Sequence, residues 1–540
     1  MRTPAWARFL SFVSLAAAPF ALPAESPPSA PPLPVTTLWQ WGPVATSFSS
    51  STDVWNAPAS ARLFDTNGDG VVNRQDDPSL VLISGNSVHI VTGQGVPCGQ
   101  SGTTPSACHT GVLRVLDGRT GAEQYSLDKA SPDSSGFAGI AVALGDVLRN
   151  GTTQIVAVTG EGYVVLVGST SSPPVAGSMT VLRTSDQPLP GASDTRFGSA
   201  GALALGDMDA DGTLAIAFGS TVYDTTDDAI TLRFTGISGS GGTHPFTAVS
   251  VLADLDGQPG LELAAGRTAY RGDGSIFWDR AGLADGFAAV ADVDGNGWPE
   301  VVLVSSGDVL VLEGTTGMTL HGPLTAPGTG AGGPPVLADF DHDLAPEIGV
   351  AKSDRYSVLE PDPLAAVTWQ TETHDYSSST TGSVAFAFEG DHVSDVVYGD
   401  ECFLWVMDGA SGGVRLGLSH TSFTATEMPI VADVDGDSRA ELVLASTGAD
   451  PYLFGCENAV GDPITINGVT WQPSGSASGA YRGVVVYNAA SGEWANASAL
   501  WDEHTFRADA TSFRRGGADF LPFLDGFELG DLLGWDAAVP

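Results

Sequence analysis

Acidic residues recur along this chain at a spacing that suits the binding of a divalent cation. The pattern D-x-D-x-D-G-x-x-E lies between two apolar runs, most clearly in VADVDGNGWPEVVLVSS (Asp292 to Glu300) and VADVDGDSRAELVLAST (Asp433 to Glu441). Carboxylates at positions one, three and five of a tight loop bring their oxygens to one point, and glycine at position six permits the turn. A backbone carbonyl near position seven and the acid at position nine complete a shell of roughly six to eight oxygens, which suits calcium. Zinc would require sulfur or nitrogen ligands, which these loops lack.

Other segments carry the pattern less completely. LADFDHDLAPEIGVAKS keeps its acids, VLADLDGQPGLELAAG has Gln258 at position five, and ALGDMDADGTLAIAFGS has Ala215 in place of the glutamate. The loop LFDTNGDGVVNRQDDPSLVLIS begins at Asp65 and fits the EF-hand pattern, except that Asp76 replaces the final glutamate. No amphipathic helix flanks this loop, so we interpret it as an extended member of the same series.

The predicted calcium ligands come from these six loops. They are Asp65, Asn67, Asp69 and Asp76; Asp207, Asp209 and Asp211; Asp254, Asp256 and Glu262; Asp292, Asp294, Asn296 and Glu300; Asp339, Asp341, Asp343 and Glu347; and Asp433, Asp435, Asp437 and Glu441. A single copy could be an ordinary Asp/Gly turn, but several copies in phase favour metal binding. We expect the calcium to be structural rather than signalling, because carboxylates without a metal repel one another and leave the turn frayed.

Two further copies are degenerate, and we predict no metal ligands in them. One keeps Asp146 and little else, and the other, around Glu389 to Asp395, reads as a shortened loop. The later copies follow one another at about 38 to 47 residues, enough for one four-stranded antiparallel blade. A second motif in phase with the first is a strand followed by a D-G-x-[ST]-G-like turn, as in VLRVLDGRTG, VLVLEGTTG, LWVMDGASG and VVVYNAASG. Each repeat therefore predicts a small sheet that must stack on its neighbours around an axis.

The loops, together with FGSAGALALGDMDADG (Phe197 to Gly212), resemble FG-GAP and VCBS repeats, found in integrin α-chain head propellers and in bacterial secreted proteins. The resemblance covers about residues 50 to 495. It implies an all-β fold, a seven- or eight-bladed β-propeller of four-stranded antiparallel blades. It also implies calcium on one rim and ligand binding by the opposite or neighbouring loops. We place the propeller at residues 39–506.

Composition and the chain ends suggest an exported protein. The 540 residues include 63 Asp and Glu against 22 Lys and Arg, a net charge of -41, which argues against nucleic-acid binding. Residues 1–24, with Arg2, Arg8 and an apolar run, resemble a secretory signal. Residues 25–38 form a proline-rich linker, and residues 507–540 form a tail that could act as a sorting signature. We expect no transmembrane helix, a monomer, and a location outside the bacterial cell or on its outer surface.

Four cysteines and several short motifs complete the sequence predictions. In an oxidising compartment we expect the disulfides Cys98–Cys108 and Cys402–Cys456. The tripeptide Arg271-Gly272-Asp273 could bind integrins, and the stretch from Gly409 to Gly413 matches the nucleophile elbow G-x-S-x-G. For both motifs we favour a plain hairpin turn.

We predict a binding or adhesion module whose partner is an extracellular protein or glycan, with no catalytic residues. The alternative is a carbohydrate-active protein on the same scaffold, either a lectin-like binder or a polysaccharide lyase or hydrolase. Such an enzyme would need titratable residues that converge outside the calcium loops.

Overall fold

The computed structural model describes residues 30–42, 47–86, 107–194, 196–226, 228–242, 247–363, 366–391, 393–423 and 426–501. Within these ranges the chain forms short β-strands and turns, and its helices are two 3-10 turns, η1 (Ala107–His109) and η2 (Ala176–Ser178). Runs of valine, leucine and alanine favour strands, and the glycine and aspartate between them favour turns. The prediction of an all-β fold is confirmed. No helix in the described ranges is long and apolar enough to cross a lipid bilayer.

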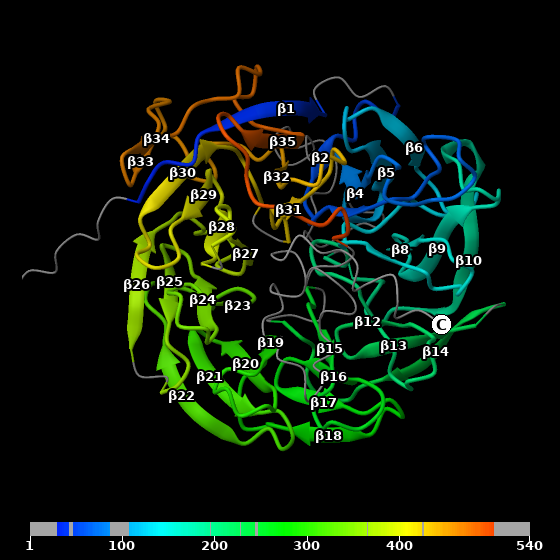
Figure 1. The fold of residues 1–540 in the computed structure, drawn as a ribbon, viewed down its shortest axis with the longest axis horizontal. Helices are drawn as coiled ribbons and strands as arrows, with labels where there is room; N and C mark the ends of the chain where they lie inside the picture. Colours follow the sequence, from blue (N-terminus) through cyan, green and yellow to red (C-terminus); the bar gives the residue numbers. More distant parts are fainter. Residues whose placement is uncertain are drawn as a thin grey trace, which may run out of the picture.

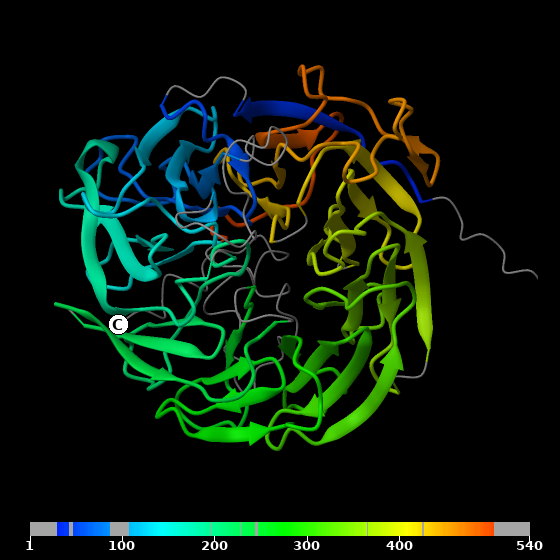
Figure 2. The same cartoon turned by 180° about the vertical axis from the view of Figure 1, so that it is seen from behind.

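Antiparallel four-stranded units follow one another around a central axis, like the blades of a propeller (Figure 1), and the same ring is seen from its other face in Figure 2. In the first half of the chain these blades consist of β2 (Asp53–Val54), β3 (Ala59–Ala61), β4 (Ser79–Gly85), β5 (Val112–Asp117) and β6 (Glu123–Leu127); β7 (Ala143–Gly145), β8 (Gln154–Val158), β9 (Tyr163–Ser169) and β10 (Met179–Pro188); β11 (Ala204–Gly206), β12 (Ala215–Phe218), β13 (Thr221–Thr225) and β14 (Ile230–Thr235); and β15 (Val251–Ala253), β16 (Glu262–Ala265), β17 (Thr268–Tyr270) and β18 (Ile276–Asp279). A single parallel pair, Ser185↔Ile230, joins β10 to β14.

The second half of the chain continues the ring. Its blades consist of β19 (Phe287–Ala291), β20 (Glu300–Ser305), β21 (Asp308–Glu313) and β22 (Thr319–Thr325); β23 (Val336–Ala338), β24 (Glu347–Ala351), β25 (Arg355–Leu359) and β26 (Val367–Glu372); β27 (Ser383–Phe386), β28 (Asp395–Gly399), β29 (Phe403–Met407) and β30 (Val414–Ser419); and β31 (Ile430–Ala432), β32 (Glu441–Ser446), β35 (Gly483–Ala489) and β1 (Val35–Trp41). Because successive strands are antiparallel, the connections alternate between the two rims of the ring. The acidic loops, which join the first and second strands of a blade, therefore share one rim.

The two ends of the described chain close the ring together. Strand β1 is the outermost strand of the blade whose other strands are β31, β32 and β35. Its first residue, Val35, pairs with Ala489, the last residue of β35. The blades thus begin at Val35, earlier than residue 39, because this segment buries Trp39 and Trp41 in the closing blade. The sequence prediction had assigned residues 35–38 of this strand to the proline-rich linker.

The blades bury both faces of their inner strands. All six residues of β20 are buried, whereas the outermost strand β22 of the same blade alternates between half-buried and exposed residues. Apolar side chains of neighbouring blades pack together, as Val302 and Val304 do with Leu337 and Ile348. This face-to-face stacking satisfies sheets that could not bury both faces alone.

Tryptophans on the outermost strand of one blade contact a glycine turn of the next blade. Trp278 on β18 donates its indole N–H to the carbonyl of Gly314 at 2.7 Å. The same hydrogen bond joins two further pairs of blades, through Trp39 to Gly118 and through Trp369 to Gly409. The indole ring of Trp278 also packs against Gly317, the last glycine of the turn. A Cβ on Gly317 would lie 2.6 Å from this indole. The D-G-x-[ST]-G turns are therefore contact points between blades.

This contact predicts a specific cost for a methyl group in the turn. Gly317 has a φ of +68°, so Gly317→Ala strains the backbone and also drives a Cβ into the Trp278 ring. We expect this variant to lose about 2 to 4 kcal/mol in free energy of unfolding, measured by denaturant titration. The matched control is Gly492→Ala, because Gly492 holds the same turn position with φ +79° and has open space around its Cβ. The control should lose only about 1 kcal/mol, and equal losses would contradict an inter-blade role.

A long connection, residues 447–482, leaves the closing blade between β32 and β35 and carries the hairpin β33 (Thr465–Ile466) and β34 (Val469–Thr470) (Figure 1). It packs against the neighbouring blade, where Trp471 is fully buried and donates to the carbonyl of His420 at 2.9 Å. The predicted disulfide Cys402–Cys456 fastens the connection to the turn between β28 and β29. Cys108 is also disulfide-bonded, whereas Cys98 lies outside the described residues.

Candidate metal centres

The register of each blade fixes where its acidic loop begins and ends. In the blade β19–β22, Ala291 at the end of β19 pairs with Glu300, the first residue of β20. Asp292 therefore occupies position one and Glu300 position nine. The same register recurs in three other blades through the pairs Ala253↔Glu262, Ala338↔Glu347 and Ala432↔Glu441. Antiparallel pairing thus returns position nine to the side of position one.

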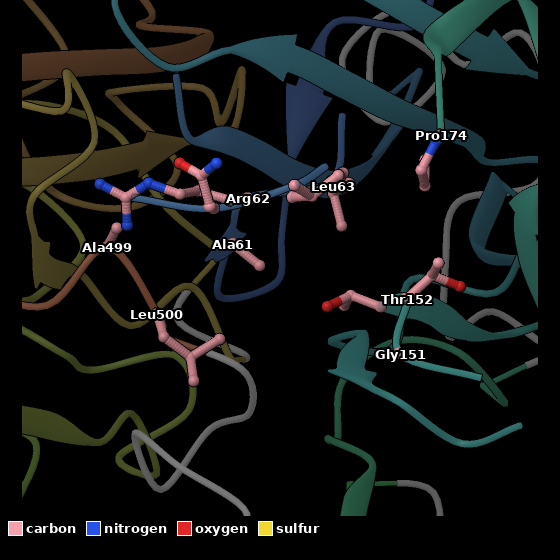
Figure 3. Close-up of a pocket in the computed structure, with 11 residues that line it drawn as sticks. Ala61, Arg62, Leu63, Gly151, Thr152, Pro174, Ala499 and Leu500 are labelled. Carbon is pink, nitrogen blue, oxygen red and sulfur yellow. The ribbon is translucent and has the colours of Figure 1, made fainter. Parts of the chain in front are cut away.

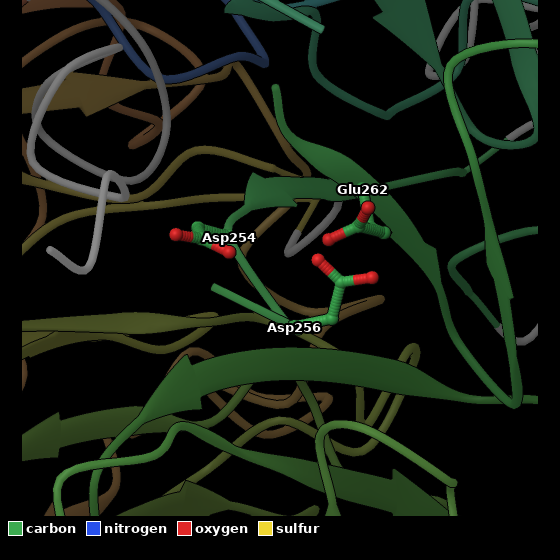
Figure 4. Close-up of side chains that lie close together, drawn as sticks. All are labelled: Asp254, Asp256 and Glu262. Atoms are coloured by element: carbon green, nitrogen blue, oxygen red, sulfur yellow. The ribbon is translucent and has the colours of Figure 1, made fainter. Parts of the chain in front are cut away.

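Four loops bring three carboxylates together. In each cluster, one oxygen from positions one, three and nine lies within 4.8 Å of the other two, close enough to share one ion with bonds of about 2.3–2.6 Å. Figure 4 shows Asp256 and Glu262 facing each other, with Asp254 beside them at the end of β15. The four clusters are Asp254, Asp256 and Glu262; Asp292, Asp294 and Glu300; Asp339, Asp341 and Glu347; and Asp433, Asp435 and Glu441.

The glutamate at position nine is buried and held in one orientation. In the Asp292 loop, the backbone N–H of Val293 donates to Glu300 Oε2 at 3.0 Å, and Glu300 is only 1% exposed. The corresponding donors in the other clusters are the backbone N–H groups of Leu255, Phe340 and Val434. The second oxygen is left for the cluster, and in Glu347 the buried Oε1 has no hydrogen-bond partner among the described residues. A buried, unpaired carboxylate oxygen is costly unless a cation satisfies it, so these residues fit a calcium ion.

Burial shifts the pKa of these carboxyl groups in the absence of metal. Desolvation, reinforced by the neighbouring aspartates, raises the pKa of Glu262 to about 7, those of Glu300 and Glu347 to about 8, and that of Glu441 to about 9. Desolvation also raises the pKa of Asp433 to about 6, against the attraction of Arg62. The clusters therefore hold negative charge at neutral pH only at a cost that a bound cation would offset.

In three of the four cluster loops, those at Asp292, Asp339 and Asp433, positions four and six adopt left-handed backbone conformations. Gly295 and Gly297 have φ values of +68° and +85°, and in the Asp339 loop the same positions hold His342 at +71° and Leu344 at +73°. The sequence pattern, which carries glycine at position six, predicts a left-handed conformation at that position only. Side chains other than glycine are strained in this region, so the hydrogen bonds of position one must impose the turn. Asp339 accepts the backbone N–H groups of both His342 and Leu344.

The comparisons with known proteins agree with this repeat geometry. A model of the FG-GAP-like repeat matches residues 292–350, a segment that contains the loops at Asp292 and Asp339. The chain contains an FG-GAP-like repeat. A search of curated protein sequences finds no match.

Among solved structures, the chain is similar to the V. cholerae biofilm matrix protein Bap1 at 17% identity and a TM-score of 0.62, over 87% of this chain and 94% of Bap1. It is also similar to the rhamnogalacturonan lyase YesW at 16% identity and a TM-score of 0.50, over 77% of this chain and 74% of the lyase. At these identities the likeness concerns the fold alone.

The remaining predicted ligands of the acidic loops lie outside the four clusters of three. At position five, Asn296, Asp343 and Asp437 each accept a backbone N–H from two residues further along the same loop at 2.8 Å. In the Asp65 loop, Asp76 is nearly buried and accepts the backbone N–H groups of Thr66, Asn67 and Asn73. These hydrogen bonds outweigh desolvation and lower the pKa of Asp76. Its role as a ligand stays a prediction, as do those of Asp65, Asn67 and Asp69.

Arginines divide the four clusters into two kinds. Arg271 contacts Asp256 at 3.0 Å, and Arg62 from the neighbouring blade lies 3.6 Å from Asp433. The clusters at Asp292 and Asp339 form no ion pair with the described basic residues. We therefore regard the latter two, both within the FG-GAP-like repeat, as the strongest candidates for metal binding.

The two short motifs lie in hairpin turns, each of which contacts the neighbouring blade. Arg271 of the RGD tripeptide is engaged by Asp256 and lies over the Phe277 ring, and the following Gly274 packs against Phe234 of the preceding blade. Ser411 of the G-x-S-x-G stretch donates its hydroxyl to Asp408 within its own turn. The geometry therefore favours a hairpin turn for both motifs, over an integrin-binding role for the RGD tripeptide and a nucleophilic role for Ser411.

A cavity of about 260 Å³ opens between two loops on the acidic rim (Figure 3). Its walls include Leu63, Thr152, Pro174 and Leu500. Arg62 also lines the cavity, but its guanidinium pairs with Asp433. The described lining residues offer no pair of titratable groups that could perform acid–base chemistry.

Proposed function

We propose that the protein is a secreted, calcium-stabilised β-propeller of eight blades that acts as an extracellular binding or adhesion module. The observation that carries the calcium part is the fourfold recurrence of one carboxylate cluster at one register position, each with a buried glutamate. Because these ions would join the first and second strands of their blades, we assign calcium mainly a structural role.

The count of eight rests on the sheet topology. The eight-stranded sheet β7–β14 comprises two blades, and six further sheets of the described chain each supply one. The last of these is closed by β1 from the beginning of the chain.

An extracellular location agrees with the disulfide Cys402–Cys456, the strongly acidic composition and the signal-like N-terminus. It also matches the setting of Bap1, a biofilm matrix protein with a similar fold. We further propose that the protein acts as a monomer and does not bind nucleic acid, because its charge repels a phosphate backbone.

Binding is favoured over catalysis by the way the buried acids outside the loops are used. Asp400 and Glu401 lie together on the rim opposite the acidic loops, near His374. Asp400 accepts the N–H groups of Cys402, Phe403 and Trp405 at 2.7–2.8 Å, and Glu401 accepts the backbone N–H of Ser377 at 2.7 Å. These oxygens hold turns in place, as structural acids do. The fold likeness to a rhamnogalacturonan lyase keeps a carbohydrate-active protein as the second candidate.

We place the ligand surface on the same opposite rim, on the connection 447–482. Tyr452 and Leu453 are 53% and 62% exposed there, and Tyr376 on a neighbouring connection is 61% exposed. Exposed tyrosine presents an apolar face and a hydrogen-bonding hydroxyl, which suits sugars and protein surfaces alike. The backbone around them is fixed by the disulfide and by a hydrogen bond from His374 Nε2 to the carbonyl of Phe454 at 2.9 Å.

The test is a binding screen of the calcium-loaded protein on a glycan array and on immobilised extracellular matrix proteins. The double variant Tyr452→Ala/Leu453→Ser should lose at least about tenfold in affinity for the probe that binds, as the loss of an aromatic anchor predicts. Its melting temperature should stay unchanged, because both side chains are exposed. A matched control is Val460→Ser, an exposed residue of the same connection. Wild-type affinity in the double variant would contradict this surface, and turnover of an arrayed glycan would favour the enzyme.

A further inference from the structure

Besides the longer loop at Asp65, three loops of the described ring lack a glutamate at position nine. The strand register assigns that position to Gln154, Ala215 and Asp395, through the pairs Gly145↔Gln154, Gly206↔Ala215 and Phe386↔Asp395. The loop around Glu389 therefore has the same length as the others and opens at Ala387, which corrects its interpretation as shortened. In all three loops, a side-chain nitrogen of the protein contacts the loop oxygens.

Arg415 supplies that nitrogen in the blade β27–β30. Its side chain is 5% exposed and extends from the outermost strand β30 to Glu389 at position three and Asp395 at position nine of its own blade. The guanidinium contacts both oxygens of Glu389 as well as Asp395 Oδ2. It therefore bridges the two positions that a bound ion would bridge in the four clusters.

Arg233 supplies the nitrogen in the blade β11–β14, where it contacts position three alone among the loop positions. It also starts from the outermost strand, β14, and contacts both oxygens of Asp209, the residue at position three, at 2.7 Å. A second contact at 2.9 Å reaches Asp224 on β13. Position nine of this loop is Ala215, so the arginine neutralises a loop that could offer an ion fewer carboxylates.

Gln154 supplies the nitrogen in the blade β7–β10, from position nine itself. Its amide Nε2 donates to Asn150 Oδ1 at position five, to the backbone carbonyl of Thr152 at position seven and to Thr152 Oγ1. Positions five and seven are those whose oxygens a calcium loop directs at its ion. The amide N–H groups of Gln154 thus satisfy the oxygens at positions five and seven.

We propose that Arg233, Arg415 and Gln154 stand in the place of the ion in these three loops, and that the calcium requirement of the ring is confined to the blades that keep a buried glutamate. This inference rests on the proposed calcium function. Arg233 and Arg415 start from the outermost strands of different blades and reach the same loop position. Arg271, which contacts Asp256 at position three of a loop that keeps its glutamate, starts instead from the turn between β17 and β18. The clusters at Asp292 and Asp339 lack such an arginine among the described residues and keep Glu300 and Glu347.

Thermal melting of four single variants, each with excess calcium and with excess EDTA, tests the proposal. Arg415→Met should lower the melting temperature by about 5 °C or more, and by the same amount in both media, because it removes a cation that is part of the chain. Arg233→Met, whose side chain is 16% exposed, should behave alike with a smaller loss and serves if the first variant does not fold. Glu300→Gln should melt lower than wild type when calcium is present, and at the same temperature as wild type in EDTA. Arg280→Met, whose guanidinium contacts the carbonyl of Gly317 and no loop acid, is the matched arginine control.

Gln154→Glu gives an isosteric test in the opposite direction. It replaces the amide donor with a carboxylate that faces Asn150 and Thr152, so the variant should melt lower than wild type in EDTA. Excess calcium should restore most of this loss, and equilibrium dialysis should find additional calcium bound compared with wild type. An equal loss in both media, with unchanged calcium content, would overturn the role of Gln154.

The outcomes separate this inference from the proposed function. If calcium shifts the melting of wild type but leaves Arg415→Met and Arg233→Met with wild-type stability, or if their losses occur only with calcium, the inference is wrong and the calcium function stands. If calcium and EDTA give the same melting temperature for wild type and for Glu300→Gln, the proposed calcium function is itself wrong.

Discussion

Removal of calcium is expected to lower the melting temperature of the protein by about 10 °C or more. Each site would contribute about 2.7 kcal/mol when free calcium exceeds its dissociation constant a hundredfold, and four clusters together would contribute about 10 kcal/mol. The loss arises because the folded state no longer gains the binding free energy of an ion at each cluster of three carboxyl groups. Calorimetry and near-UV circular dichroism, with calcium and with EDTA, measure the effect. Identical melting in both media would contradict it.

Single substitutions should divide this effect among the clusters. Glu300→Gln and Glu347→Gln keep the shape of the side chain but remove the charge at position nine, so each should reduce the bound calcium by one ion per chain. The matched control is Glu313→Gln, at the end of β21 and outside the clusters, which accepts the Thr316 hydroxyl within its own turn. Equilibrium dialysis followed by elemental analysis counts the ions. A control that loses an ion, or glutamate variants that keep all of theirs, would contradict the assignment.

The metal-free protein should become less stable as the pH rises from about 4.5 to about 8. The folded-state pKa values of Glu300 and Glu347 are about 8, above the value of 4.5 for an unperturbed glutamate. Between these values the folded state holds more protons than the unfolded state, so stability falls with rising pH by about 1.4 kcal/mol per pH unit for each group. For Glu441, whose pKa is about 9, the loss of stability continues up to about pH 9. For Glu262, whose pKa is about 7, it ends at about pH 7.

Calcium binding at pH 7 should therefore release protons. The ion requires ionised carboxylates, and Glu300, Glu347 and Glu441 are mostly protonated at that pH without metal. Isothermal titration in two buffers of different ionisation enthalpy should show about one proton released at each of these three sites. Glu300→Gln should remove one of them. An enthalpy that does not depend on the buffer would mean that the glutamates are already ionised.

The sequence by itself determined the features that nine consecutive residues can build. Asp292, Asp294 and Glu300 could be predicted as one cluster because the loop and its antiparallel register bring positions one, three and nine together within a single hairpin. The glycine turns followed for the same reason, since a turn is a property of a few neighbouring residues. The left-handed conformation of His342 at position four was missed because a residue other than glycine gives only a weak signal for a positive φ.

Only the tertiary structure decided what lies around these loops. The burial that raises the pKa of Glu441, the hydrogen bond from Trp278 to the turn of the next blade and the arrival of Arg415 at Glu389 and Asp395 all join strands or blades that are separate in the sequence. The closure of the ring pairs Val35 with Ala489, across nearly the whole described chain. Local spacing cannot encode such contacts, because they depend on how complete sheets pack against one another and on which side chains that packing buries.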